Sequence, residues 1–345
     1  MNGKGSGSRG QARPVSTTSM TGRLLTTLFA LAIISAPLPV EAQQAGRPPR
    51  IGVLCLTPCQ ELAVGAFRRA LRELGYVEGR TLVFEYRDAE WKVERLPALA
   101  GDLVQSKVDV IFTPWGTAAA LAAKRATTTI PVVIGAAGDP VRAGIVASLS
   151  KPGGNVTGVS SLALELEGKR LELAKEVVPK VSRVGIFWNP ESTYSALAFK
   201  EVEAAARALG VRLHAVRLTG PSDLDTAFAT LKRDRVEALV LHGYVATLQN
   251  RRAIIAFAAA NRLPTIYPSR EYVDEGGLLS YGANVADVSR RAAHYVDRIL
   301  NGAKPADLPV EQATTVELVV NVKTARALGI AIAPSVLLRA EQVVE

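Results

Sequence analysis

Apolar and polar positions repeat in the same order in two blocks of the chain. The run Arg50-Ile51-Gly52-Val53-Leu54 has a counterpart 133 positions later, Arg183-Val184-Gly185-Ile186-Phe187. In each block, short apolar runs alternate with amphipathic stretches of helical period. Each block then closes on an apolar run that starts at a proline, Pro131 or Pro264, again 133 positions apart. This alternation predicts parallel βαβ units, and its repetition predicts two similar lobes.

The pattern assigns most of the chain to strands and helices. The first block predicts strands at 51–55, 81–86, 108–112, 131–135 and 156–160, and helices at 60–75, 92–106, 117–126 and 140–149. A helix at 165–178 leads into the second block. That block predicts strands at 183–187, 211–217, 236–241, 264–267 and 278–281, and helices at 193–209, 223–234 and 246–262. A helix at 285–301, a strand at 316–322 and a helix from Pro334 follow.

The predicted strands are apolar throughout, which is typical of sheets covered by helices on both faces. The fold class is therefore α/β, with two similar doubly wound parallel-sheet lobes and a cleft between them, where small ligands bind. We expect an N-terminal lobe at 50–162 plus about 284–310. The C-terminal lobe is expected at 163–283 plus about 311–345.

The N-terminus has the order of a secretory signal peptide. Arg23 precedes an apolar run at 24–35, and a small-residue cleavage site ends at Ala42. The run is shorter than the span of about 20 apolar residues that crosses a membrane, although an uncleaved anchor is the alternative. We expect residues 1–42 to be removed, with Met20 as an alternative start. The mature chain would then lie in the periplasm with no stable membrane insertion.

The charge distribution and the absence of catalytic motifs argue against a nucleic-acid-binding protein and against an enzyme. The formal net charge is +9, but the basic residues are spread over helix faces rather than gathered with aromatic residues, so no nucleic-acid surface is expected. We find no nucleophile elbow, no phosphate-binding loop and no His-Glu-x-x-His motif. An enzyme would have to use His242 or Asp139, and this interpretation is the less favoured one. No cofactor and no metal are expected.

The chain has two cysteines, Cys55 and Cys59, four positions apart. A metal site at this spacing would need further ligands. In an oxidising compartment a close pair forms a disulfide, which we favour over two free thiols and over a redox-active pair.

Candidate site residues are those that follow the carboxyl ends of the predicted strands, where doubly wound folds bind ligands. Free N–H groups at Gly116 and Thr117 would suit a carboxylate, although Thr117 can equally be a helix cap. Asp139 can take an ammonium group or start a helix before Pro140. The small residues at 135–138 allow close backbone approach. The full set is Thr57, Trp115, Gly116, Thr117, Ala136, Ala137, Asp139, Asn189, Tyr194, Tyr244 and Tyr267.

Several motifs carry a resemblance to a known family. They are Gly138-Asp139-Pro140-Val141, Ser150-Lys151-Pro152-Gly153-Gly154-Asn155-Val156-Thr157-Gly158, Gly276-Gly277-Leu278-Leu279-Ser280-Tyr281-Gly282, Glu317-Leu318-Val319-Val320-Asn321 and Arg339-Ala340-Glu341. From Arg50 to Glu345 the chain resembles bacterial substrate-binding proteins of ABC transporters with the type I periplasmic-binding fold, in the branch that includes aromatic amino-acid receptors. The resemblance implies two lobes joined by three crossovers that close over a small ligand.

These observations together predict a secreted solute receptor. We expect a monomer that binds a small carboxylate-bearing ligand, an amino acid or a related acid, in the cleft. Hinge closure would exclude water, and the ligand would pass to the permease subunits of an ABC transporter. The alternative from another class is a ligand sensor that docks on a membrane signalling protein.

Overall fold

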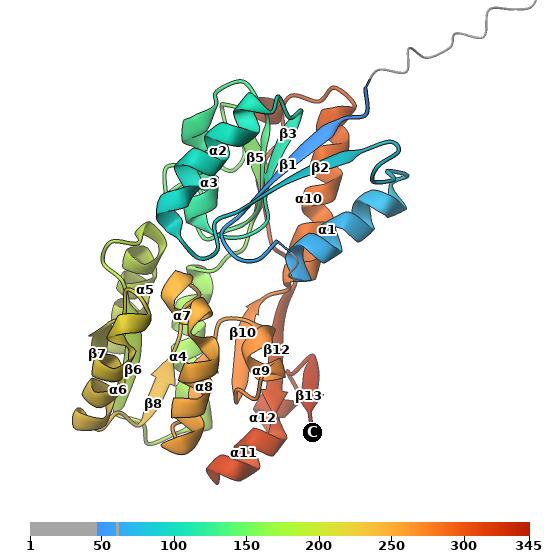
Figure 1. Cartoon of the computed structure of the whole chain (residues 1–345). Coiled ribbons are helices and arrows are strands. Elements are labelled where there is room, and N and C mark those ends of the chain that lie inside the picture. Colours follow the sequence, from blue (N-terminus) through green and yellow to red (C-terminus); the bar gives the residue numbers. More distant parts are fainter. Residues whose placement is uncertain (1–46, 60–61) are drawn as a thin grey trace, which may run out of the picture. The chain divides into compact units, whose positions relative to one another are not determined.

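The computed structural model of the chain describes residues 47–59 and 62–345. The predicted signal peptide at 1–42 and the alternative start at Met20 lie outside these residues. Among the described residues, no helix is both long enough and apolar enough to cross a membrane. From Pro48 onward the chain builds two sheets, each with helices on both faces (Figure 1).

The first sheet is parallel and has the order β11-β5-β4-β3-β1-β2. Its strands are β1 (Arg50–Cys55), β2 (Val83–Asp88), β3 (Val110–Thr113), β4 (Val132–Ala137), β5 (Val156–Ser160) and β11 (Glu311–Gln312). Successive side chains of β1 point to opposite faces. Ile51 and Val53 pack with α1 (Leu62–Glu73) and α10 (Val285–Leu300), whereas Leu54 packs with α2 (Leu96–Gln105) and α3 (Thr117–Ala126). We call this sheet and its helices the first lobe.

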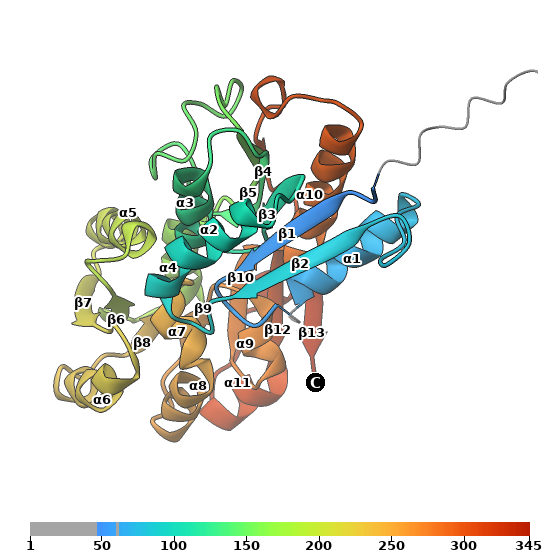
Figure 2. The same cartoon turned by 45° about the horizontal axis from the view of Figure 1, so that its top comes forward.

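The second sheet has the order β13-β12-β10-β9-β8-β6-β7, and its pairs are parallel except β10 with β12. Its strands are β6 (Arg183–Trp188), β7 (Arg212–Arg217), β8 (Ala238–Val240), β9 (Thr265–Tyr267), β10 (Leu279–Ala283), β12 (Val316–Asn321) and β13 (Gln342–Val344). One face is covered by α4 (Glu165–Val177), α5 (Thr193–Leu209), α11 (Val322–Leu328) and α12 (Pro334–Leu337). The other is covered by α6 (Leu224–Arg233), α7 (Val245–Gln249), α8 (Arg251–Ala260) and α9 (Arg270–Asp274). This is the second lobe (Figure 2).

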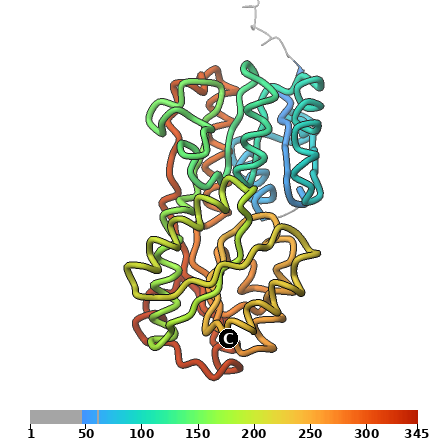
Figure 3. The backbone as a smooth tube through the Cα atoms, turned by 90° about the vertical axis from the view of Figure 1, so that its left-hand side faces the viewer, coloured from blue at the N-terminus to red at the C-terminus, as the bar shows by residue number. Residues whose placement is uncertain are grey.

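Within the described ranges the chain passes between the lobes three times, after β5, after β10 and after β11. Figure 3 shows the late, orange-to-red part of the chain running through both lobes. The last crossing lies beyond Gln312, slightly later than the expected boundary at about 311. The reason is that β11 is tied to the first sheet, since the Val310 and Ala313 N–H groups donate to Leu149 O and Ser160 O at 2.7 and 2.8 Å.

Three predicted helices differ in the structure. The segment 140–149 is a series of turns, because Asp139 Oδ1 accepts from the N–H groups of Val141 and Arg142, and Gly144 then takes a φ of +72°. The helix predicted at 246–262 is divided into α7 and α8 at Asn250. The helix predicted from Pro334 is one turn, and β13 follows it as an additional strand.

Candidate ligand-binding site

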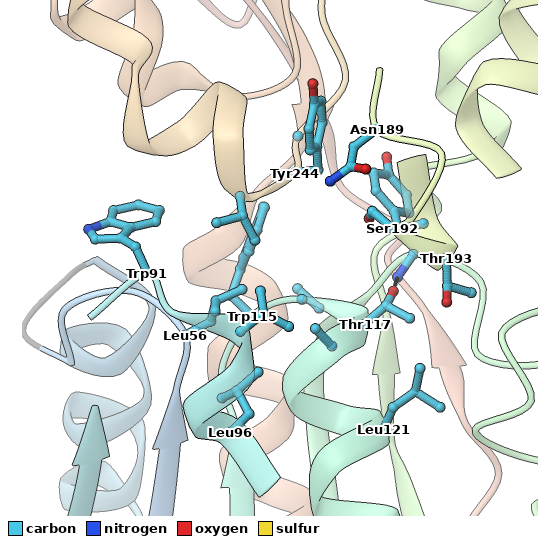
Figure 4. A pocket seen from close by; sticks show the side chains of 18 of the residues that line it. Leu56, Trp91, Leu96, Trp115, Thr117, Leu121, Asn189, Ser192, Thr193 and Tyr244 are labelled. Carbon is cyan, nitrogen blue, oxygen red and sulfur yellow. Dashed lines mark hydrogen bonds between the residues drawn. The ribbon is translucent and has the colours of Figure 1, made fainter. Parts of the chain in front are cut away.

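A pocket with a volume of about 1050 Å³ lies where the carboxyl ends of the two sheets meet. That volume is at the upper end of small-molecule sites, which span about 300–1,000 Å³. Figure 4 shows residues of both lobes around it. The first lobe contributes the apolar walls Leu56, Trp91, Leu96, Trp115 and Leu121, and the second lobe contributes Tyr244 and Pro268.

The N-terminus of α3 opens into this pocket. Its N-cap is Gly116, with φ 90° and ψ 140°, and no side chain caps the helix. The N–H of Gly116 is not free as expected, because it donates to Ala136 O at 3.2 Å. The next N–H groups, at Thr117 and Ala118, lie in the first helical turn, which has no acceptor within the helix. Gly116, Thr117 and Ala118 all line the pocket, so these donors and the positive end of the helix dipole are available to an anion.

Seven of the residues proposed from the sequence line the pocket: Trp115, Gly116, Thr117, Ala136, Asn189, Tyr194 and Tyr244. They lie at the carboxyl ends of β3, β4, β6 and β8: Ala136 is near the end of β4, and the others are in the loops or first helical turns that follow β3, β6 and β8. Thr117 Oγ1 lies 3.5 Å from Gly138 N. The amide of Asn189 has a fixed orientation, because its Oδ1 accepts from Glu191 N at 2.9 Å, and its side chain extends into the pocket.

Four predicted residues are not on the pocket lining. Thr57 lines a smaller neighbouring cavity of about 160 Å³. Ala137 is buried in the sheet, and its carbonyl accepts from Ser161 N at 2.9 Å. Tyr267 is buried and stacks on Tyr272 with 4.9 Å between ring centroids. Asp139 holds the turn that follows it, so its carboxylate is engaged by backbone rather than presented to a ligand.

Among the pocket residues that sequence reasoning missed are Trp91 and Arg170. Trp91 and the preceding Glu90 both have positive φ, 67° and 51°, which is uncommon for residues other than glycine. The turn is fixed by Trp91 N donating to Leu56 O at 2.9 Å, so the indole stands on the pocket wall. Arg170 also lines the pocket although its helix belongs to the crossing segment rather than to a strand-end loop. A charged residue on the buried face of that helix was the available sequence signal.

His242 is fully buried, and its Nε2 lies 2.7 Å from Ser195 Oγ, which accepts from Asn189 N at 2.8 Å. Burial lowers the pKa of His242 to about 3, with a further contribution from the charge of Arg170. The imidazole is therefore neutral and braces the loop after β6. His242 is not among the residues that line the pocket.

Cys55 and Cys59 are joined by a disulfide with 5.5 Å between their Cα atoms. The bond holds the loop after β1, and Cys59 N donates to Asp88 Oδ2 at 3.1 Å. Leu56, inside this loop, reaches the pocket. Within the described part of the chain, no cluster of His, Cys, Asp and Glu is arranged to hold a metal ion.

With this geometry in place, the chain can be compared with known proteins. The model of the family described as ABC transporter substrate binding protein matches residues 51–344. The chain belongs to this family. This substrate-binding protein is 27% identical over 271 residues to a tyrosine-binding protein of Clostridioides difficile strain R20291, which covers 79% of the chain and 77% of the relative.

Solved structures give the same fold. A Streptococcus pneumoniae protein in complex with L-Trp is similar with a TM-score of 0.80 and 27% identity, covering 86% of this chain and 100% of that one. The ligand-free, open structure of a Clostridium difficile substrate-binding protein with adhesive properties has a TM-score of 0.63 and 26% identity, covering 86% of this chain and 99% of the other. The fold of the substrate-binding protein is therefore the type I periplasmic-binding fold, as its two parallel-dominated sheets also show.

Proposed function

We propose that this substrate-binding protein is a secreted receptor for a small carboxylic acid with an aromatic or other large apolar body, an amino acid or a related acid. The observation that carries the proposal is the uncapped N-terminus of α3, which opens into a pocket with aromatic walls. Helix N-termini bind carboxylates through free N–H groups and the helix dipole. Trp115 and Tyr244 offer apolar faces for the body of the ligand.

Relatives support this class of ligand. One homologue is a tyrosine-binding protein, and one similar structure holds L-Trp. At about 27% identity, the pocket residues of this chain rather than the relatives decide which acid is bound.

The contacts between the lobes support a receptor that closes over its ligand. Arg142 Nη1, after β4, lies 2.6 Å from Glu201 Oε1 on α5. The ring of Tyr194 packs so closely on Gly138 that a Cβ there would lie 2.5 Å from it. The similarity is also higher to the L-Trp complex than to the open, ligand-free relative, 0.80 against 0.63. We infer that the lobes are arranged as in the closed state of a hinge-closing receptor.

The family supports the remaining part of the proposal, delivery to the permease subunits of an ABC importer. The signal-like order of residues 1–42 supports export to the periplasm, with a mature chain that begins at Gln43 and acts as a monomer. Mass spectrometry of periplasmic protein should find Gln43 at the N-terminus. An intact N-terminus in the membrane fraction would contradict export.

Thermal-shift measurements test the ligand class. The mature protein is heated with L-tryptophan, L-tyrosine and indole-3-acetate, and with the matching amides. A ligand that binds the folded state alone, at about 100 times its Kd, adds about 2.7 kcal/mol of stability. We expect at least one acid to raise Tm while its amide does not, and the acid to be recovered unchanged. No shift with any acid, or equal shifts with acids and amides, would refute the proposal.

A further inference from the structure

Helix α4 carries a charged pair on its buried face. Glu167 is 0% exposed and Arg170 is 1% exposed, and Leu171 and Ala174 of the same helix belong to the apolar core of the second lobe. Charged side chains are almost never this buried unless they are paired or have a ligand. The proposed function does not use this pair, so its position next to the pocket needs an explanation.

The pair presents its positive end to the pocket, because Arg170 lines it and Glu167 does not. Two groups hold the guanidinium: Nε donates to Tyr281 O at 2.8 Å, and Nη1 lies 2.7 Å from Glu167 Oε1. The latter contact is a buried ion pair, so Nη1 already faces a carboxylate oxygen. A guanidinium has five N–H donors, so it can hold the carboxylate of a ligand in addition to Glu167 and the Tyr281 carbonyl.

Arg170 is linked to the N-terminus of α3 through contacts across the cleft. The hydroxyl of Tyr194 donates to Glu167 Oε1 at 2.9 Å, beside the guanidinium. The ring of the same tyrosine packs on Gly138 of the first lobe. Gly138 N in turn lies 3.5 Å from Thr117 Oγ1, at the start of α3. Arg170 and the α3 N-terminus therefore occupy adjoining walls of one pocket, one in each lobe.

We infer that Arg170 is the cationic contact of the second lobe for the carboxylate that the first lobe holds at α3. This inference rests on the proposed function and adds a residue to it. The α3 N–H groups bind the anion first, and closure brings the guanidinium to it. Arginine suits this position because its planar fork matches a carboxylate and it stays charged when buried.

Glu167 and Tyr194 are positioning residues in this arrangement. Burial raises the pKa of Glu167, while the charge of Arg170 opposes that rise. The hydroxyl of Tyr194 has its pKa raised by burial and by the nearby carboxylate, so it remains a donor. Together they fix the guanidinium in the orientation that faces the pocket without binding the ligand themselves.

The test measures acid preference, the ratio of affinities for L-tryptophan and L-tryptophanamide, or for whichever acid and amide pair the wild-type protein distinguishes. Isothermal titration is done on wild type, Arg170→Lys and the double variant Glu167→Gln with Arg170→Gln. The double variant leaves no unpaired buried charge, so it is expected to fold, which circular dichroism checks. Lys169→Gln is the matched control, because Lys169 is an exposed cation on the same helix.

Hydrogen bonds to charged groups contribute about 1.5–3 kcal/mol, so the double variant should lose about 10- to 100-fold of acid preference. Arg170→Lys should lose less, because it keeps the charge but not the fork. The control should keep the wild-type ratio, and affinity for the amide should change little in all variants. If the double variant keeps the full acid preference, the inference about Arg170 is wrong while the proposed function stands. If wild type shows no acid preference, the proposed function itself fails.

Discussion

The step from the third strand to the next helix is built differently in the two lobes. In the first lobe, β3 leads through Gly116 directly into α3, whose start has no side-chain cap and opens into the pocket. In the second lobe, β8 leads into the additional helix α7 before α8 begins. There Thr247 Oγ1 accepts from Tyr244 N at 3.2 Å and lies 2.9 Å from the carbonyls of His242 and Tyr244.

This difference bears on which lobe binds the carboxylate of the ligand. In the second lobe Thr247 meets only the N–H of the N-cap residue Tyr244, as Ala136 O meets that of Gly116 in the first lobe, so the first-turn N–H groups of both helices lack an acceptor within the helix. The first lobe keeps its donors open and so can hold an anion. The second lobe places Tyr244 on the pocket as a wall and Arg170 as a charge. The two lobes of the repeated fold therefore contribute different groups to the pocket.

The largest effect should come from placing a charge at the open helix start. Thr117→Asp puts a carboxylate where the anion is proposed to bind, and two like charges about 4 Å apart repel by about 4 kcal/mol at an effective dielectric constant of 20. We expect at least a hundredfold loss of acid affinity by calorimetry. Thr117→Ala should cost only a few-fold.

The second lobe supplies the control for that experiment. Asn321→Ala removes the side-chain cap of α11, whose residues do not line the pocket, and should lower stability by about 1 kcal/mol with no change of acid affinity. Wild-type affinity in Thr117→Asp would show that the anion binds elsewhere.

The next effect concerns how each lobe holds its first loop. The loop after β1 is held by the Cys55–Cys59 disulfide, whereas the loop after β6 is held by hydrogen bonds of Asn189. Closing so short a loop stabilises the fold by about 2 kcal/mol in the chain-entropy treatment. Replacing both cysteines by serine should lower the free energy of unfolding by about that amount. Reductant should bring wild type to the same value.

Thiol titration of unfolded, unreduced protein checks the bond itself. We expect no free thiol. Two free thiols, or a serine variant as stable as wild type, would show that no stabilising disulfide distinguishes the loop after β1 from the loop after β6.

A smaller effect is expected where the lobes meet. A methyl group at Gly138 would lie 2.5 Å from the Tyr194 ring in the closed arrangement. Gly138→Ala should therefore weaken ligand affinity by about tenfold, since overpacking costs about 1–3 kcal/mol, while the ligand-free protein is affected less. Gly101→Ala in α2 is the control, because nothing lies within 4 Å of its Cβ. Equal affinities in the two variants would show that closure does not bring Tyr194 onto Gly138.

The last effect concerns stability rather than binding: it is the pH dependence of the braced loop in the second lobe. Burial lowers the pKa of His242 from 6.5 to about 3. Between these two pH values His242 is protonated in the unfolded chain but neutral in the folded protein. Stability should fall by up to about 1.4 kcal/mol per pH unit as pH drops from 6.5 toward 3. Denaturant unfolding should show a shallower slope for His242→Asn and an unchanged slope for the exposed His294→Gln. Identical slopes in all three proteins would exclude His242 as the cause.

Helices were predicted best from the sequence where the helical period of apolar residues agrees with residues that favour a helix start or end. The helix expected at 193–209 is found at those bounds, since Ser192 caps its start and Gly210 ends it in the left-handed conformation. The helix expected at 140–149 is absent, because Asp139 and Gly144 favour turns over the helical pattern. The break at Asn250 had no proline or glycine to reveal it.

The candidate site was predictable only in part for a related reason. The strand-end rule locates residues such as Trp115 and Asn189, because topology alone fixes that edge of the sheet. It does not locate Arg170, whose place on the pocket depends on how the crossing helix packs against the second sheet. Trp91 was missed because its position depends on two successive residues with positive φ.

The proposed function depends on a carboxylate that binds at the open start of α3. A crystal structure of the mature protein with the acid that raises Tm most shows where that carboxylate lies. We expect carboxylate oxygens within hydrogen-bond distance, about 3 Å, of the Thr117 or Ala118 N–H, with the apolar body between Trp115 and Tyr244. A carboxylate bound away from α3, with the helix start facing the apolar body or empty space, would contradict it.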